Sequence, residues 1–494
     1  MSKSAISVPG FGLSRPDGSS GSLRDAVLAG PGARVQAARI GDPIRAVVTP
    51  EQIAAALTAA GHVDKQRATL SGAVTTVLVL GLCLFSGQGS AGVITRLWPL
   101  LSVFNPVVVL CAPVCAVALS QARARLPVAV LRELFTRTAS GVAGRVTTAG
   151  SLLVFGLVVT ATDGTVFDLA ATAAIQARFA TPTGGRFPQA RAVTVIECGT
   201  RRVLAAELDS CQVSEQVLWD RLVACLKPGT INLADRNFFS MHRWHLAAAT
   251  GAHLAWRVKN GHRSLPAKIM GTLPDGSDRV RLRESDAMLT RRRKTSGEPK
   301  AARLDDIIAR LVEFTVTLTD RAGKTSTSRF RILTTLLDHD AYPAEQIAAL
   351  YAERWQAELV YKSIKSTLRG GDLRLRGQSA DLAEQEIWAL LTVYNALVDH
   401  AVTAAVDLGI DPDEISFTTI LHATRDHLIA SAPCRACGHH RDSADLQAAI
   451  TAAPRERRGR TRTGPRTKKQ RETQHTRDVS YTITITESNL PRMT

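Results

Sequence analysis

The chain has 494 residues, too many for one typical domain, and its 45% apolar and 21% charged residues exclude a disordered or fibrous protein. A net charge of +17 favours a polyanionic partner such as nucleic acid, because neutralised phosphates release their counterions; a globular protein that is merely basic is the alternative. The eight cysteines are spread thinly, which argues against a disulfide framework and fits a reducing compartment.

The N-terminal third divides into a leader and a helical region. Residues 1–38 are rich in Ser, Gly and Pro and lack the apolar segment of a signal peptide, so we predict a loose leader. Residues 39–149 predict an all-helical domain, in which Thr49 and Gln52 have the spacing of a capping box. The basic amphipathic segment 120–139 fits a helix near DNA and a solvated helix face equally well.

Two stretches without charge in the helical region raise the alternative of a membrane protein. No charged residue occurs at 68–95 or at 97–121. The apolar part of the first stretch is short, and Asn105, Pro106 and Pro113 interrupt the second. We therefore expect buried helices and no membrane segment, and keep a membrane protein with a basic soluble domain as the alternative from another class.

From residue 151 the pattern becomes that of a mixed α/β sheet. Across residues 150–252 three strand-like segments, a helix, a strand and a second helix follow one another. The first strand, in "SLLVFGLVVTATDG", is expected to end in a turn at Asp163 and Gly164, and the fourth ends at Asp235. Polar sites on such sheets lie at strand ends, so both aspartates are candidates for one site.

A block of strand-like segments with hairpin turns interrupts this order at residues 253–336 and predicts a β-rich insertion. Within it, Arg291, Arg292 and Arg293 are placed in a polar loop. Such a loop is either simply solvated or a tip that contacts DNA phosphates.

Helical sequence returns at residues 337–432, and a basic tail follows at 433–494. Nine Lys or Arg residues and a single acid lie between Arg455 and Arg471. We predict a disordered arm there with affinity for nucleic acid, because like charges repel one another and attract phosphates.

The stretch "YAERWQAELVYKSIK" holds the strongest candidate site. Tyr351, Arg354, Glu358 and Lys365 are spaced by three, four and seven residues, so they share one face of an α-helix. Periodicity alone favours an ordinary helix with surface ion pairs.

Two aspartates earlier in the chain, Asp163 and Asp235, favour an active site over an ordinary surface helix. Together with Glu358 they are three carboxylates on separate elements that one α/β fold could bring together, a donor set suited to Mg²⁺. Two such ions can clamp a phosphodiester, and Arg354 and Lys365 would contact its oxygens.

The spacing Tyr-x₂-Arg-x₃-Glu-x₆-Lys resembles the signature of the insertion-sequence-four family of DDE transposases. "TATDGT" and "LADRNFF" resemble the two aspartate motifs of that family, and "ALSQARARL" is similar to its N-terminal domain. The resemblance covers roughly residues 40–430 in the expected order. It implies an α/β fold with an RNase H-like catalytic core, interrupted by a β-rich insertion and preceded by an all-helical N-terminal DNA-binding domain.

The resemblance also implies residue roles. Asp163, Asp235 and Glu358 would form the catalytic, metal-binding triad for two Mg²⁺ ions, which Mn²⁺ can replace. The Tyr, Arg and Lys of the signature would hold DNA phosphates near the cut.

The implied reaction is cut-and-paste transposition on double-stranded DNA. Water would cut the transposon end, and the freed 3′ hydroxyl would close a hairpin and later attack target DNA; each step is an in-line displacement at phosphorus. Because two ends must be held together, a homodimer is implied, in the cytoplasm of a bacterium at its nucleoid. The alternative is a catalytically inactive derivative that binds DNA without cutting it.

Two weaker signals stay open. Cys434 and Cys437 have the spacing of half a zinc site, but no second pair lies nearby and a polar loop is favoured. Trp355 could stack on an extruded base, although core packing is the favoured interpretation.

Overall fold

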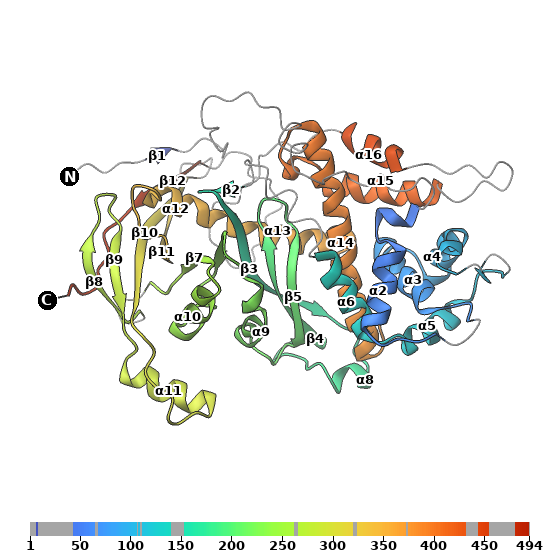
Figure 1. Cartoon of the computed structure of the whole chain (residues 1–494), viewed down its shortest axis with the longest axis horizontal. Coiled ribbons are helices and arrows are strands. Elements are labelled where there is room, and N and C mark those ends of the chain that lie inside the picture. The colour runs from blue at the N-terminus through green and yellow to red at the C-terminus, as the bar shows by residue number, and fades with distance from the viewer. Residues whose placement is uncertain are drawn as a thin grey trace.

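The computed structural model describes residues 6–7, 43–64, 68–105, 107–108, 111–139, 153–260, 265–319, 324–371, 374–430, 443–453 and 480–493. The described chain is mixed α/β, with a 12-stranded sheet at one end of the molecule and a group of helices at the other (Figure 1). The predicted α/β fold class is therefore confirmed at this level.

Among the described residues, the helical end includes short helices from the N-terminal region and one long helix from the second half of the chain. The short helices are α2 (Pro50–Ala59), α3 (Gly72–Leu84), α4 (Ser90–Leu97), α5 (Ala116–Arg125) and α6 (Val128–Ala139), and the long one is α14 (Ala380–Leu408). The predicted capping box is present at the start of α2, where Thr49 and Gln52 exchange hydrogen bonds between side chain and backbone. Pro127 separates α5 from α6, because proline lacks the N–H that would continue the helix.

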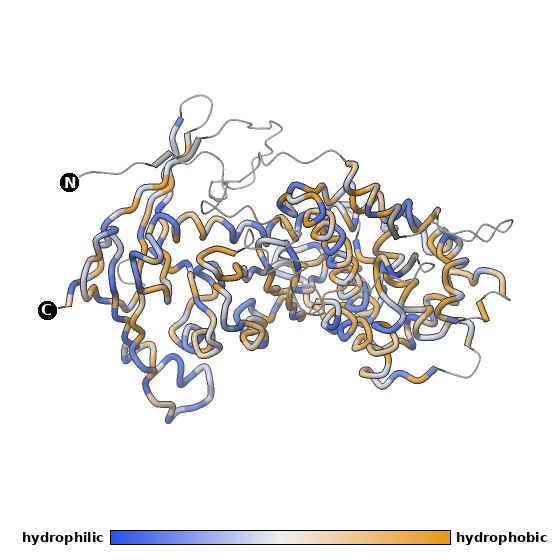
Figure 2. The backbone as a smooth tube through the Cα atoms, turned by 45° about the horizontal axis from the view of Figure 1, so that its top comes forward, coloured by the Kyte–Doolittle hydropathy of each residue, from blue (hydrophilic) through white to orange (hydrophobic). Residues whose placement is uncertain are grey.

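The first charge-free stretch of the helical end forms a core helix, as predicted, whereas the second contains a 3₁₀ helix (Trp98–Val103) and is largely exposed from residue 111 to 118. The first charge-free stretch contains α3, whose 13 residues are too few to cross a bilayer and are all buried except Ala73. Among the described residues one helix, α14, is long and apolar enough to cross a membrane, and 72% of its apolar window is buried inside the protein. Figure 2 shows hydrophobic segments throughout this end of the molecule, as expected where helices pack on one another.

Basic residues of segment 120–139 contact the protein itself, which neither sequence-based interpretation foresaw. Arg123 is buried and donates to the carbonyl of Leu382 over 3.0 Å. Arg132 pairs with Glu207 and lies over the ring of Trp388, 5.6 Å from its centroid. These cations therefore join the helical end to the sheet and to α14.

The α/β sheet follows the predicted order of elements. Its strands are β3 (Leu157–Asp168), β4 (Gln189–Glu197), β5 (Val203–Ser210), β6 (Thr230–Ala234) and β7 (His253–Arg257), with the short β2 (Leu153–Val154) paired to β3. In space the order is β5-β4-β3-β6-β7, with β3, β6 and β7 parallel and β4 antiparallel to its neighbours. Helices α9 (Glu215–Leu222) and α10 (Met241–Ala249) lie where a helix was predicted.

Two hydrophobic clusters cover the two faces of this sheet. Side chains alternate along a strand, so Val193 and Val195 of β4 pack with α9 and α10. Ala192 and Ile196 face the other way and join a cluster with α14 and the helices of the N-terminal region. The predicted helical region thus shares one continuous core with the sheet.

Part of the segment predicted as a β-rich insertion belongs to the α/β sheet. β7 lies inside the predicted insertion at 253–336, but it pairs in parallel with β6 and belongs to the α/β sheet. The insertion itself contains β8 (Ala267–Thr272), β9 (Asp278–Leu282), α11 (Asp286–Ser296), β10 (Ile307–Thr319) and β11 (Thr325–Thr334). Its last strand, β11, returns to pair with β7 and so fixes the insertion to the sheet.

The polar loop predicted around Arg291, Arg292 and Arg293 is a helix, α11. Ser285 caps its first turn, and Gly297 ends it with a φ of +71°. Apart from Leu289 this helix has no buried side chain, so apolar periodicity gave no sign of it.

The signature segment is not one regular α-helix as predicted. It passes from α12 (Ala344–Leu350) through a 3₁₀ turn, η6 (Tyr351–Arg354), into α13 (Trp355–Lys362) and then a π-helical segment, η7 (Ser363–Leu368). Changes of helix type alter where side chains point and occur often at functional sites. The polar residues of this segment therefore do not form a straight row on one regular helix; they line the cavity described below.

The predicted basic tail contains ordered elements. α15 (Phe417–Ala430) precedes it, α16 (Ser443–Thr451) lies within it, and β12 (Ser480–Ile485) pairs with β10 and with β1 (Ile6–Ser7). Strict alternation in "YTITIT" explains the strand. The basic segment 455–471, both candidate zinc cysteines and the predicted leader other than β1 lie outside the described residues.

Candidate active site

Asp163 and Asp235 lie beside each other, where the parallel pairing of β3 and β6 ends. The last pair between β3 and β6 joins Thr162 to Ala234, and each aspartate is the next residue in its chain. The predicted turn at Asp163 is wrong, because β3 continues to Asp168 in a long antiparallel pairing with β4. Neighbouring strands thus deliver both carboxylates to the same place.

A cavity of about 1100 Å³ opens beside these two aspartates. The predicted site residues that line it are Asp163, Asp235, Tyr351, Arg354, Glu358 and Lys365. Its lining also includes Glu215 and the cations Arg236, Arg257, Lys259 and Lys362. One cavity therefore collects four carboxylates within a rim of positive charge.

The other predicted arginines are not part of this cavity. Arg292 forms a two-pronged ion pair with Glu284, at 2.8 and 3.0 Å, and Arg293 donates to the carbonyl of Ala301. Arg291 is exposed on α11. In this structure Arg292 and Arg293 hold α11 to its flanking segments, and a DNA contact by any of the three stays a prediction.

Arg354 stands between two of the three predicted metal ligands. Its guanidinium nitrogens lie 3.6 Å from Oδ2 of Asp163 and 3.4 Å from Oε1 of Glu358. Arg257 approaches Oδ1 of Asp235 to 3.8 Å. The ligand oxygens of the three carboxylates do not all lie within 4.8 Å of one another. The structure therefore brings the triad to one cavity, with arginines close to its carboxylates.

The carboxyl of Asp163 is held in an unfavourable environment for its charge. Burial raises its pKa to about 6, and the charges of Glu358 and Glu215 act in the same direction, whereas Arg354 opposes the shift. A bound cation therefore stabilises the charged form of this buried carboxylate more than it would stabilise an ordinary, solvated carboxylate.

Replacing Asp163 by Asn is expected to raise the free energy of unfolding at pH 7.5, without divalent cations, by on the order of 1 to 3 kcal/mol. The pKa of Asp163 is higher in the fold than in the unfolded chain, so this carboxyl's stabilisation is complete below about pH 4 and is lost as the pH rises through 6. Denaturant unfolding at pH 5 and 7.5 measures the effect. An Asn variant less stable than wild type at pH 7.5 would contradict the assignment.

The donor chemistry of the cavity fits a divalent cation. Asp163, Asp235 and Glu358 offer hard carboxylate oxygens from three separate elements, as Mg²⁺ prefers. The arginine pairs show that this group of carboxylates attracts positive charge.

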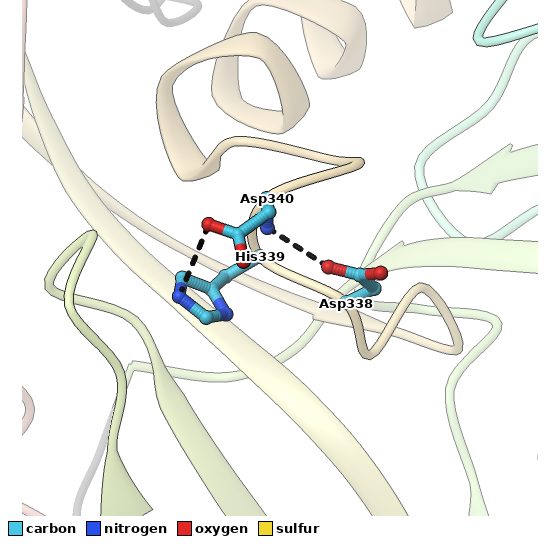
Figure 3. A group of neighbouring side chains, drawn as sticks. All are labelled: Asp338, His339 and Asp340. Atoms are coloured by element: carbon cyan, nitrogen blue, oxygen red, sulfur yellow. Dashed lines mark hydrogen bonds and ion pairs between the residues drawn. The ribbon is translucent and has the colours of Figure 1, made fainter.

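A second group of possible metal ligands lies on an exposed turn, outside the cavity. The ligand atoms of Asp338, His339 and Asp340 lie within 4.8 Å of one another, on consecutive residues (Figure 3). Oδ1 of Asp338 accepts the backbone N–H groups of Asp340 and Ala341, at 2.9 and 3.2 Å, and these bonds lower the pKa of Asp338. The carboxylate thus shapes the turn, and none of the three residues lines the cavity.

Tyr351 and Lys365 hold the strands that carry the aspartates. Tyr351 is 7% exposed, and its hydroxyl donates to the carbonyl of Ala234 over 3.4 Å, next to Asp235. Nζ of Lys365 donates to the carbonyl of Val166 over 2.5 Å, and burial, with the charge of Arg369, lowers its pKa to about 8. Both contacts are to backbone, and phosphate contacts by the two side chains stay predictions.

Trp355 lines the cavity and is only partly buried, so it is not a fully buried core side chain, and its role stays a prediction. In the hydrophobic cluster with α9 and α10, the core tryptophans are Trp219, Trp244 and Trp256, which pack edge to face. Trp355 begins α13 directly after the 3₁₀ turn. This position leaves part of its indole facing the cavity.

Tyr361 and Glu215 are among the residues of the site that were missed from the sequence. Tyr361 donates its hydroxyl to the carbonyl of Asp163 over 2.6 Å and lies 2.8 Å from Oγ1 of Thr194. It follows Glu358 by three residues, so its helix face could have indicated it. Glu215 was hidden by its position in the first turn of α9, where an acid is ordinary.

The sequence matches two transposase family models and one curated relative. The family model described as Transposase DDE domain matches residues 155–396, and the one described as Insertion element 4 transposase N-terminal matches residues 43–136. Transposase InsG for insertion sequence element IS4 of Escherichia coli (strain K12) is 27% identical over 376 residues, 75% of this chain and 78% of that protein. The cryo-EM structure of a piggyBac transposase synaptic complex with hairpin DNA aligns over 84% of this chain and 85% of that chain, with a TM-score of 0.40 and 8% identity. The two family models together span the helical end and the sheet with its cavity.

Proposed function

The chain belongs to the insertion-sequence-four family of DDE transposases, and from that premise we propose that it cuts the two ends of its own mobile element and joins them to target DNA. One observation carries the proposal: Asp163, Asp235 and Glu358 reach a single cavity from two strands and a helix. We further propose that the sheet β5-β4-β3-β6-β7 is an RNase H-like core.

The proposed roles follow the chemistry of the lining. Asp163, Asp235 and Glu358 would hold Mg²⁺, or Mn²⁺ in its place. Bound at this site, two such ions would make water a nucleophile at neutral pH and offset the charge that develops on the phosphate oxygens. DDE transposases as a family use divalent metal ions, in agreement with this donor set.

The cationic rim of the cavity would bind the DNA backbone. It consists of Arg236, Arg257, Lys259, Arg354, Lys362 and Lys365. Such cations neutralise phosphates and orient the scissile bond, arginine by paired hydrogen bonds. Lys365 would have to leave the carbonyl of Val166 to reach a phosphate, whereas Arg354 already points into the cavity.

The order of steps is part of the proposal. One site can cut the end, close a hairpin and transfer the strand, because each step is an in-line displacement at phosphorus. Trp355 is placed to stack on a base that leaves the duplex during hairpin closure. Two ends must meet, so we propose a homodimer on double-stranded DNA, acting at the nucleoid in the cytoplasm of its host.

The test is a cleavage assay on duplexes that carry the inverted repeats flanking the gene. Wild-type protein with Mg²⁺ or Mn²⁺ is expected to nick these ends, release a 3′ hydroxyl and join it to a plasmid, and to be inactive with EDTA. A denaturing gel resolves nicked, hairpin and joined products. Binding to the ends without nicking in either metal would show instead an inactive derivative that only binds DNA.

A further inference from the structure

A fourth carboxylate, that of Glu215, lies in the cavity beside the predicted triad. Glu215 begins α9 after the capping residue Ser214 and lines the cavity with Asp163 and Asp235. We propose that Glu215 is a positioning residue, which fastens the turn that carries Asp235 to the strand that carries Asp163. The inference rests on the proposed function only in its catalytic consequence.

We call the two contacts of Glu215, to the turn after β6 and to β3, the Glu215 clamp. The first contact is with the turn after β6. Nδ2 of Asn237 donates to Oε2 of Glu215 over 2.7 Å. The neighbouring Gln216 donates from Nε2 to the backbone carbonyl of Asn237 over 2.8 Å and approaches its Oδ1 to 3.2 Å. The first turn of α9 therefore holds Asn237, two residues after Asp235, by several hydrogen bonds.

The second contact is with β3. Oε1 of Glu215 lies 2.5 Å from the position that a Cβ would occupy on Gly164, the residue after Asp163. Any side chain at position 164 would meet this carboxylate. The φ of Gly164 is not in the left-handed region, so a side chain at this position would be opposed by the Glu215 carboxylate, which would have to shift, and not by the backbone conformation.

Together the two contacts hold the chain beyond the point where hydrogen bonds of the sheet join β3 to β6. The hydrogen-bonded register of β3 and β6 ends at Thr162 and Ala234, one residue before each aspartate. Beyond that point Asp235 lies on a turn closed by the bond from the N–H of Phe238 to its carbonyl. Glu215 reaches from this turn to the backbone of β3 and so limits how far Asp235 can move relative to Asp163.

The alternative is that Glu215 merely complements the dipole of α9 at its N-terminus. That role involves neither Asn237 nor Gly164, and any acid in a first turn can perform it. Glu345 in the first turn of α12 is such an acid: it is exposed and lines no part of the cavity. Glu345→Ala is therefore the matched control for Glu215→Ala.

The experiment measures the clamp first without reference to activity. Amide hydrogen exchange across residues 235–240 is compared in the full-length wild type, Glu215→Ala, Gly164→Ala, the double variant and Glu345→Ala. Faster exchange is expected in Glu215→Ala and Gly164→Ala, with little further increase in the double variant, because Gly164→Ala displaces the same carboxylate that Glu215→Ala removes. Glu345→Ala is expected to match wild type. Unchanged exchange in Glu215→Ala, or full additivity in the double variant, would overturn the clamp.

Cleavage of the inverted-repeat duplex then tests its catalytic consequence. Glu215→Ala is expected to lower cleavage about 10- to 100-fold at limiting Mn²⁺, with recovery at high Mn²⁺ and unchanged affinity for the duplex. Glu215→Gln, which keeps an acceptor for Asn237, is expected to recover most of the activity. A loss that excess Mn²⁺ and the Gln variant leave unchanged would overturn the positioning role. If the wild-type protein does not cleave the duplex, the proposed function fails. Hydrogen exchange still shows whether Glu215 restrains the turn that carries Asp235.

Discussion

Alanine at Asp163, Asp235 or Glu358 is expected to reduce cleavage of the transposon ends by about a thousandfold or more, with binding to those ends retained. Each change removes one of three carboxylates that reach the cavity from β3, the end of β6 and α13. Two carboxylates cannot hold two cations in a fixed arrangement, so the reaction and not the affinity for DNA is lost. Nicking of an end-labelled duplex and a gel-shift assay measure the two quantities separately.

The exposed acidic turn supplies the control for this prediction. Asp340→Ala removes a carboxylate from the group of Asp338 and His339, which lines no part of the cavity, and is expected to leave cleavage unchanged. Double alanine variants within the triad are expected to be no worse than the single ones, because residues that act as a unit are not additive. Cleavage by any triad variant within about tenfold of wild type would remove that residue from the catalytic unit.

The sequence predicted those parts of the fold that have strong local signals. Thr49 and Gln52 form the expected capping box, and the apolar strand in "TINLAD" ends just before Asp235. Local signals failed where pairing partners decide the structure. Asp163 and Gly164 have the composition of a turn, yet pairing with β4 extends the strand through them. The assignment of β7 to the insertion failed for the same reason, since its parallel partner β6 lies elsewhere in the sequence.

The candidate site was predicted in outline, but its internal contacts were not. Helical spacing placed Arg354 and Glu358 on one face, and they do interact across a distance of 3.4 Å. Spacing could not show that Tyr351 would lie in a 3₁₀ turn and Lys365 in a π-helical segment. Glu215 has no distinctive spacing at all, because it reaches the site through the packing of α9 against the sheet.

Arg354 lies beside two of the predicted metal ligands, so we expect it to compete with a divalent cation for them. The guanidinium lies between Asp163 and Glu358 and offsets part of their repulsion. The neighbouring acidic groups raise the pKa of Arg354 even though burial opposes its charge, so the side chain stays cationic at any pH the protein tolerates. A divalent cation at these carboxylates has to compete with it. A displaced Arg354 would still lie at the cavity, where a DNA phosphate is its natural partner.

Replacing Arg354 by Ala is therefore expected to have two effects of opposite sign. The maximal rate of end cleavage should fall by about 100- to 1000-fold, because a charge-assisted donor to the phosphate is lost. The Mn²⁺ concentration for half-maximal activity should fall as well, because the cation no longer competes with a guanidinium for Asp163 and Glu358. Cleavage rates across a Mn²⁺ titration give both quantities, and calorimetric titration of Mn²⁺ into the free protein checks the second.

Two comparisons make this prediction specific to Arg354. Arg243→Ala breaks an ion pair with Asp220 outside the cavity lining and is expected to change neither the rate nor the metal dependence. Arg354→Lys keeps a cation but not the fork that reaches two carboxylates, so it should lie between alanine and wild type in both quantities. A fall in rate with weaker metal binding would mean that Arg354 holds the carboxylates in place for the metal. Tighter metal binding with a lower rate would mean that it yields its place to the metal and then binds the DNA.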